Sequence, residues 1–204
     1  MRNRDVFINC PFSHDYANFF RAIFFTVIYS GYRPRCALET DDGAENRFNK
    51  ICRIIGECRL GIHDISKTEP DTKSKLPRFN MPLELGLFLA AKQFGAGPQK
   101  TKLCIILDKK PYRYQKFISD IAGQDIHSHN NSLASLVKET ASWLRDEAQD
   151  PNVPGGVKIA REFRKFTRVI PSICKQKSLA PGELTFQDFR KMAEAWIIQT
   201  NPAD

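Results

Sequence analysis

The feature that most constrains the fold is an alternation of short β-prone runs and longer helical patterns between residues 5 and 130. In the segments between most of the β-prone runs, apolar side chains recur at helical spacing. Strands joined by helices pair in parallel through right-handed crossovers. We therefore expect an α/β fold with a parallel sheet of about five strands and helices on both faces. The predicted strands are 5–9, 33–38, 60–65, 102–107 and 125–129.

Capping residues, proline and glycine set the expected helix boundaries. Asp42 and Glu45 have capping-box spacing, Asn80 is expected to cap the helix after the third strand, and Pro111 suits a first helical turn. Only helical patterns follow residue 130, so we expect an α/β domain over 1–130 and a helical C-terminal extension over 131–204 packed on it. The predicted helices lie near 14–30, 42–58, 80–95, 111–122, 132–148, 158–170 and 185–199.

Composition and spacing exclude several classes of protein. The six cysteines form no CxxC pair, which indicates reduced thiols in a cytosolic protein, and the first predicted strand begins too early to leave room for a signal peptide. No apolar stretch approaches the ~20 residues of a membrane helix. His127 and His129 alternate on a predicted strand without further ligands at metal spacing, and no glycine-rich phosphate loop is present. We expect a cytoplasmic protein with no metal and no bound cofactor.

The formal charge of +8 favours acidic partners such as nucleotides or nucleic acid. Part of this charge is gathered on one predicted helix, 158–170, whose opposite side is apolar. This basic face is interpreted either as solvated surface or as a contact for nucleic acid or another acidic partner. Its residues are Arg161, Arg164, Lys165 and Arg168.

Glu84 is the residue with the strongest indication of chemistry. It follows a polar loop and lies one turn inside the predicted helix, on the same face as Asn80. We expect the positive end of the helix to keep its carboxylate ionised and the sheet topology to aim it into the crevice at the carboxyl ends of the strands. The alternative is a structural glutamate that only complements the helix dipole.

Loops after the first three strands bring further polar groups to the same predicted edge. Reaction at the anomeric carbon of a ribosyl group needs a carboxylate to attack or stabilise the carbon, and polar groups to assist the leaving base and hold the sugar. We expect Glu84 and Asp64 to be catalytic. The remaining candidates, for substrate binding, are Asn9, Cys10, Pro11, Phe12, Ser13, Glu39, Ser66, Arg78 and Asn80. Each has a structural alternative as a cap, turn or core residue.

Residues 5–110 resemble two families. Asp5–Asn9 (DVFIN) with Ser13 and Asp15 is similar to the first conserved segment of Toll/interleukin-1 receptor (TIR) domains, and 54–66 is similar to their helix-strand-serine segment. Glu84 falls where enzymatic TIR domains place a catalytic glutamate. The order Asp64, Asn80 and Glu84-Leu85-Gly86 also resembles nucleoside 2-deoxyribosyltransferases, in which the glutamate of such a sequence is the nucleophile.

The resemblance implies a flavodoxin-like fold and an N-glycosidase that cleaves NAD or a related nucleotide, of the kind that bacteria use as effectors against phage. Base exchange between nucleosides and a non-catalytic signalling or scaffold module are the alternatives. The chain departs from these families at Asn9-Cys10-Pro11 and at Pro82, which leaves the substrate open between NAD, nucleotide and nucleoside. We also expect a homo-oligomer or a partner-activated complex, because a neighbouring subunit often completes such sites.

Overall fold

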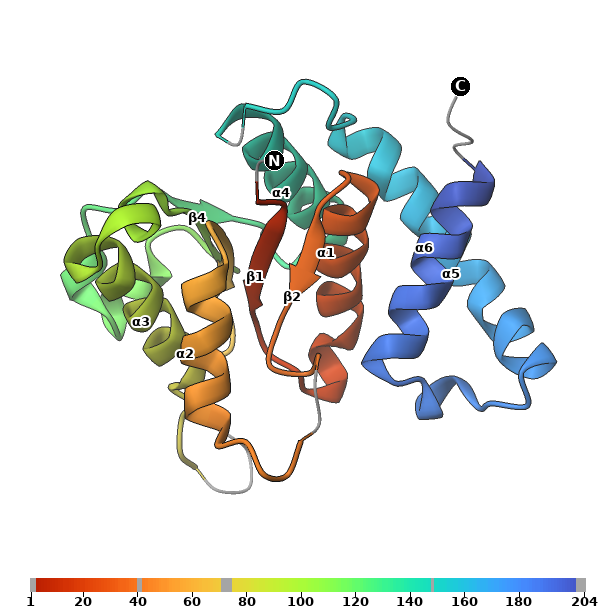
Figure 1. Cartoon of the computed structure of the whole chain (residues 1–204), viewed down its shortest axis with the longest axis horizontal. Coiled ribbons are helices and arrows are strands. Elements are labelled where there is room, and N and C mark those ends of the chain that lie inside the picture. The colour runs from red at the N-terminus through yellow and green to blue at the C-terminus, as the bar shows by residue number, and fades with distance from the viewer. Residues whose placement is uncertain (1–2, 40–41, 71–74, 148, 201–204) are drawn as a thin grey trace.

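The computed structural model describes residues 3–39, 42–70, 75–147 and 149–200. Its centre is a five-stranded sheet in which every pairing is parallel and the strand order is β2-β1-β3-β4-β5 (Figure 1). This arrangement confirms the predicted α/β class and is that of a flavodoxin-like fold. The strands are β1 (Asp5–Asn9), β2 (Arg33–Arg35), β3 (Leu60–Asp64), β4 (Leu103–Asp108) and β5 (Ile126–Ser128).

Helices cover both faces of the sheet, as expected. The α-helices are α1 (Ala17–Tyr29), α2 (Arg47–Glu57), α3 (Asn80–Phe94), α4 (Leu133–Asp146), α5 (Gly156–Gln176) and α6 (Phe186–Thr200). Short 3-10 helices occupy His14–Tyr16, Gly97–Thr101, Arg113–Lys116, Ser119–Ile121 and Pro181–Glu183. Within the described residues, no helix is both long enough and apolar enough to cross a membrane.

The two sides of the sheet have separate hydrophobic cores because side chains alternate along each strand. Val6 and Ile8 pack in the cluster that includes α1 and α4, whereas Phe7 between them packs against α2 and α3. A third cluster joins Ile106 of β4 to Leu85 of α3. The position of α3 is therefore fixed by two cores.

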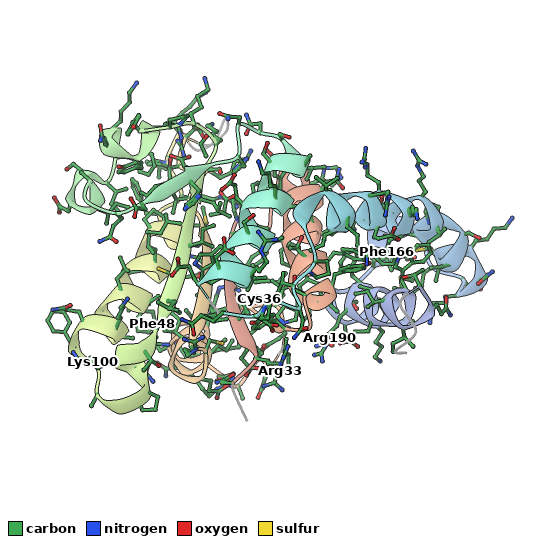
Figure 2. All side chains as sticks on the ribbon, turned by 90° about the horizontal axis from the view of Figure 1, so that it is seen from above. Arg33, Cys36, Phe48, Lys100, Phe166 and Arg190 are labelled. Atoms are coloured by element: carbon green, nitrogen blue, oxygen red, sulfur yellow. The ribbon has the colours of Figure 1, made fainter. Side chains whose placement is uncertain are left out.

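The C-terminal helices continue the core on the α1 side. Phe25 of α1 stacks on Phe166 of α5 at a ring distance of 5.3 Å, and Phe166 in turn meets Phe189 of α6 at 5.5 Å. Figure 2 shows Phe166 among the helices of this C-terminal region. The predicted boundary at residue 130 falls in the Asn130–Asn131 turn between β5 and α4, where both residues adopt positive φ.

Three local predictions need correction. The capping box at Asp42 does not start a helix, because the Asn46 side chain accepts hydrogen bonds from the amides of Phe48 and Asn49 and starts α2 later. Asn80 is the first residue of α3 and not its cap, which is Phe79. The helix predicted over 111–122 is replaced by two 3-10 helices.

Candidate active site

A cavity of about 470 Å³ opens at the carboxyl ends of the first strands. Its wall is built by the loop after β1, the turn after β2, the start of α2, the loop after β3 and the start of α3. Carboxyl ends of parallel strands are where ligands bind in α/β folds. The lining residues are Cys10, Pro11, Phe12, Ser13, Asp15, Leu38, Arg47, Lys67, Glu69, Pro70, Arg78, Asn80, Met81 and Glu84.

Glu84 is the buried carboxylate of this cavity. Its residue surface is 8 % exposed, and its carboxylate makes no hydrogen bond or ion pair with any other described residue. Burial raises the pKa of Glu84 to about 7, and the nearby positive charge of Arg47 offsets only part of this effect. The expectation that the helix terminus keeps this group fully ionised is therefore wrong, because the loss of solvation outweighs the dipole.

The chemical consequence is a carboxyl group that is present in both its protonated and its ionised form near neutral pH. Glu84 lines the cavity and its carboxylate accepts no hydrogen bond from a described residue, so the ionised form can attack an electrophilic carbon or stabilise a positive one. A group whose pKa lies close to the operating pH also exchanges protons efficiently. Perturbed carboxyl groups in clefts are characteristic of functional sites.

The loop after β1 contributes mostly apolar wall. Burial raises the pKa of the Cys10 thiol well above its ordinary value, so this thiol is neutral. The Phe12 ring packs edge-on against Phe20 at 5.2 Å and also borders the cavity. Ser13 donates to Asp15 at 2.6 Å. Arg78 and Asn80 line the opposite side and are exposed.

Asp64, Ser66 and Asn9 are not in the cavity wall. Asp64 is 0 % exposed and accepts hydrogen bonds from the Tyr16 hydroxyl at 2.5 Å, the Ser66 amide at 2.8 Å and the Ser66 hydroxyl. Asn9 donates to the Met81 carbonyl at 2.8 Å and lies 3.0 Å from Nδ1 of His63. These contacts tie β1, β3 and the first turn of α3 together beneath the cavity.

A serine, a histidine and an aspartate meet at this buried position without forming a catalytic triad. Nε2 of His129 lies 2.8 Å from Ser66 Oγ and 3.2 Å from Asp64 Oδ2, so the aspartate and the serine share one ring nitrogen. In a triad they occupy opposite nitrogens. Nδ1 of His129 has no partner among the described residues, and Ser66 is only 3 % exposed. The cluster instead anchors the start of the cavity loop 67–70.

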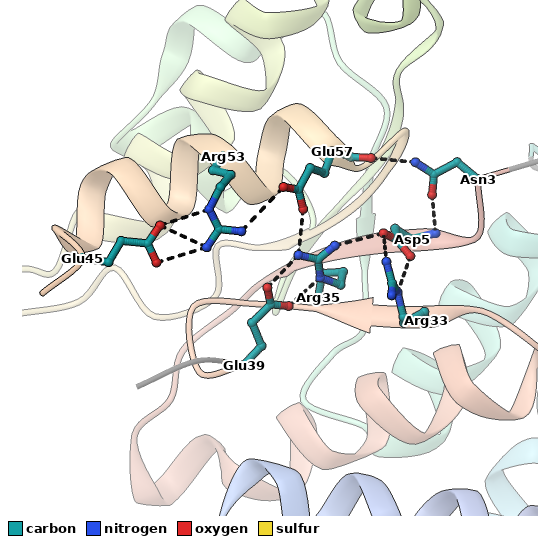
Figure 3. Close-up of polar contacts among 8 residues, drawn as sticks. All are labelled: Asn3, Asp5, Arg33, Arg35, Glu39, Glu45, Arg53 and Glu57. Carbon is teal, nitrogen blue, oxygen red and sulfur yellow. Dashed lines mark hydrogen bonds and ion pairs between the residues drawn. The ribbon is translucent and has the colours of Figure 1, made fainter. Parts of the chain in front are cut away.

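Glu39 also lies outside the cavity wall, in an ion-pair network at the edge of the sheet. Arg35 donates to both carboxylate oxygens of Glu39 at 2.6 and 2.7 Å, and also to Asp5 at 3.0 Å and Glu57 at 2.8 Å (Figure 3). Because its oxygens are already paired with a guanidinium, Glu39 has a structural explanation here. The turn after β2 presents Leu38 to the cavity in its place.

The predicted basic face lies on α5 and is not part of the cavity. Arg161, Arg164, Lys165 and Arg168 are all exposed. Arg161 and Lys165 lie 3.6 and 2.9 Å from Glu162, which is the acidic residue on this helix. Most of the positive charge of α5 is therefore not balanced within the helix.

Sequence analysis missed several cavity residues, of which Arg47 is the most informative. Placing the helix start at Asp42 put Arg47 more than a turn inside the helix, whereas it is the first residue of α2. Lys67 and Glu69 were missed because they lie in a loop without periodicity. Recognising Asn46 as the stronger N-cap is the sequence signal that would have brought Arg47 to the sheet edge.

Comparison with known proteins adds no assignment, because no protein-family model and no curated protein sequence matches the chain. Among the described residues, no group of three His, Cys, Asp or Glu side chains is placed to hold a metal ion. The site is therefore interpreted from its own geometry.

Proposed function

We propose that the protein is a cytoplasmic N-glycosidase that cleaves the bond between ribosyl carbon and base in NAD or a related nucleotide, with Glu84 as its catalytic carboxylate. The observation that carries this proposal is the buried, unpaired Glu84 in a cavity at the carboxyl ends of the strands. The resemblance to TIR domains and deoxyribosyltransferases supports the same bond type, and an anti-phage effector role follows from it. Six free cysteines fit a reducing compartment.

In this reaction the C1′–N bond breaks and its electron pair leaves with the base. The ionised Glu84 attacks or stabilises C1′, and a water then supplies the hydroxyl group of the sugar product and returns a proton to solvent. Asn80 borders the same cavity and holds a sugar hydroxyl. Asp64 acts through the loop that it anchors and is a positioning residue, since its oxygens are occupied beneath the wall.

Product analysis by chromatography tests this function. Purified protein is incubated with NAD, and separately with a mixture of nucleosides, at low and high protein concentration. We expect release of nicotinamide, and we expect Glu84→Gln to abolish it while the variant stays folded. Glu139→Gln, which changes a half-buried glutamate paired with His127 outside the cavity, is the matched control and keeps full activity. Release that survives in Glu84→Gln overturns the proposal.

Two other outcomes assign the alternatives. Exchange of bases among nucleosides identifies a deoxyribosyltransferase. Absence of turnover in both assays, even at the high concentration that favours self-association, supports a scaffold module. Turnover that appears only at high concentration supports the expected homo-oligomer.

The unbalanced charge of α5 supports a second proposal, that this face contacts nucleic acid. Binding through Arg161, Arg164, Lys165 and Arg168 then weakens steeply with salt, because phosphate contacts release counterions. Fluorescence anisotropy with a labelled duplex at two salt concentrations measures this effect. Binding that is unchanged when all four residues are neutralised rejects it.

A further inference from the structure

The charges in the cavity wall are unevenly paired. Asp15 is bound by Lys67, and Glu69 is bound by Lys109 and Arg113. These two cavity carboxylates are therefore neutralised. The remaining cavity cations, Arg47 and Arg78, make no ion pair or hydrogen bond with another described residue.

Two guanidinium groups that make no ion pair with another described residue border one cavity, which favours anion recognition, and the charge of Arg47 also acts on the buried Glu84. A guanidinium presents its N–H donors in a planar fork that matches two phosphate oxygens. Arg35 is paired with three carboxylates and Arg113 with Asp108. Arg47 and Arg78 differ from these two arginines because they border the cavity without such a partner among the described residues.

The backbone adds donors at the same place. Asn80 and Met81 begin α3 and line the cavity, and the N-cap residue Phe79 makes no side-chain capping hydrogen bond. The first amides of a helix point out of its N-terminus and carry partial positive charge, which favours a bound phosphate. The α2 terminus carries Arg47 itself. Two guanidinium groups and the N-terminus of α3, which has no side-chain cap, thus border the same cavity.

Glu84 fixes where such an anion lies relative to the reacting carbon. A phosphate beside a buried carboxylate is repelled, so a substrate phosphate lies toward the cavity mouth, where Arg47 and Arg78 are exposed, and its sugar lies toward Glu84. In a nucleotide, the phosphate on the 5′ oxygen and the glycosidic bond at C1′ stand on opposite sides of the ribose ring oxygen. A nucleoside has no group for the two guanidinium groups to bind.

We propose that Arg47 and Arg78 bind the phosphate on the 5′ oxygen of the ribosyl group, which makes the substrate a phosphorylated nucleotide and excludes nucleosides. This inference rests on the proposed function and adds the substrate class and two specificity-determining residues. It also disfavours the base-exchange alternative, because free nucleosides are the substrates of that reaction.

Equilibrium binding separates the phosphate contact from turnover. Isothermal titration calorimetry at pH 8 compares AMP with adenosine on the Glu84→Gln background, which does not consume the ligand. We expect AMP to bind at least about thirtyfold more tightly, and we expect Arg47→Ala and Arg78→Ala each to weaken AMP binding about tenfold while leaving adenosine unchanged. The double variant then binds both ligands equally.

Arg164→Ala on α5 is the matched control, because it removes the same charge from an exposed site outside the cavity, and it retains the preference for AMP. Inorganic phosphate and ribose 5-phosphate compete with AMP if the inference is correct. Equal affinity for AMP and adenosine, a preference that survives in the double variant, or no binding of either ligand at millimolar concentration overturns it.

The two proposals fail in different ways. A preference for AMP that depends on both arginines, together with no cleavage of any nucleotide by the wild-type protein, keeps the phosphate contact and rejects the glycosidase. Cleavage of nucleosides as fast as nucleotides, abolished by Glu84→Gln, keeps the glycosidase and rejects the phosphate contact.

Discussion

Two buried carboxyl groups at the same edge of the sheet have opposite surroundings. Asp64 ends β3 and accepts three hydrogen bonds, from Tyr16 and from the amide and hydroxyl of Ser66. Glu84 lies one turn inside α3, is nearly as buried, and accepts none from the described residues. The hydrogen bonds around Asp64 stabilise the fold, whereas the surroundings of Glu84 leave a desolvated carboxyl group without a hydrogen-bond donor among the described residues.

This contrast distinguishes the two carboxyl groups more clearly than residue type does, and it is the basis for proposing Glu84 as the reactive one. Ser66, His129 and Asp64 have the composition of a hydrolase site, but they are closed to solvent and bonded to one another through a single ring nitrogen of His129. The surroundings of Glu84 resemble those of a raised-pKa catalytic acid, in which burial without partners destabilises the charged form. Folded proteins retain destabilising buried groups of this kind mainly at functional sites.

Removing Asp64 has the largest expected effect on stability. Asp64→Ala leaves the buried Tyr16 hydroxyl and Ser66 amide without their acceptor and the Ser66 hydroxyl with His129 alone, and we expect it to lower the free energy of unfolding by about 4 kcal/mol. Urea denaturation followed by circular dichroism measures this loss. Asp64→Asn, which keeps one acceptor oxygen, is the milder variant if the alanine variant does not fold. A loss below about 1 kcal/mol contradicts the structural role.

Removing the charge of Glu84 is expected to increase stability, which is the opposite of the effect of removing Asp64. Its folded pKa of about 7 is above the ordinary value of 4.5, so the native protein binds more protons and wild-type stability falls between these two pH values as pH rises. We expect Glu84→Gln to raise the free energy of unfolding by about 2 kcal/mol at pH 8 and to change it little at pH 4. Urea denaturation at both pH values measures the difference; equal effects at pH 4 and pH 8 would falsify this explanation.

The rate of the proposed reaction follows the same ionisation. If the ionised Glu84 attacks or stabilises C1′, kcat/KM falls about tenfold per pH unit below pH 7 and levels off above it. NAD is the substrate for this experiment because its diphosphate does not titrate in the same range. A profile that is flat from pH 5 to pH 8 indicates that Glu84 is not required in its ionised form.

The smallest effects come from a matched pair of serines. Ser66→Ala removes a buried hydroxyl group that bonds Asp64 and His129, and we expect a loss of about 1 kcal/mol in the free energy of unfolding. Ser13→Ala removes a hydroxyl group that bonds only the exposed Asp15, and no measurable change in stability is expected. Thermal and urea denaturation of both variants, side by side, test the assignment. Equal losses show that the two surroundings are not distinct.

Local sequence patterns predicted those elements whose formation depends on residues close together in the sequence. The sequence predicted all five strands, although β2 ends at Arg35 and not at residue 38. Thr185 and Asp188 form reciprocal capping bonds at the start of the predicted last helix. The α-helix predicted after Pro111 does not form, because the backbone conformation of Tyr112 and the contacts of Arg113 with residues outside this segment compete with it. Tyr112 adopts a positive φ of 56°, and Arg113 is drawn to Asp108 and the Ile65 carbonyl. Asp108 is only five residues before Arg113, but the Ile65 carbonyl is 48 residues away and no local pattern contains it.

The parallel sheet, its helices and the place of Glu84 near the start of α3 were predictable from local patterns, because alternation and periodicity encode which faces are buried. Which carboxyl group is satisfied and which is not depends on the folded interior. Asp64 meets Tyr16 across 48 residues and Ser66 meets His129 across 63, and desolvation of Glu84 depends on every element around it. Hydrogen bonding and solvation are properties of the assembled interior, so they cannot be assigned from a residue's neighbours in sequence.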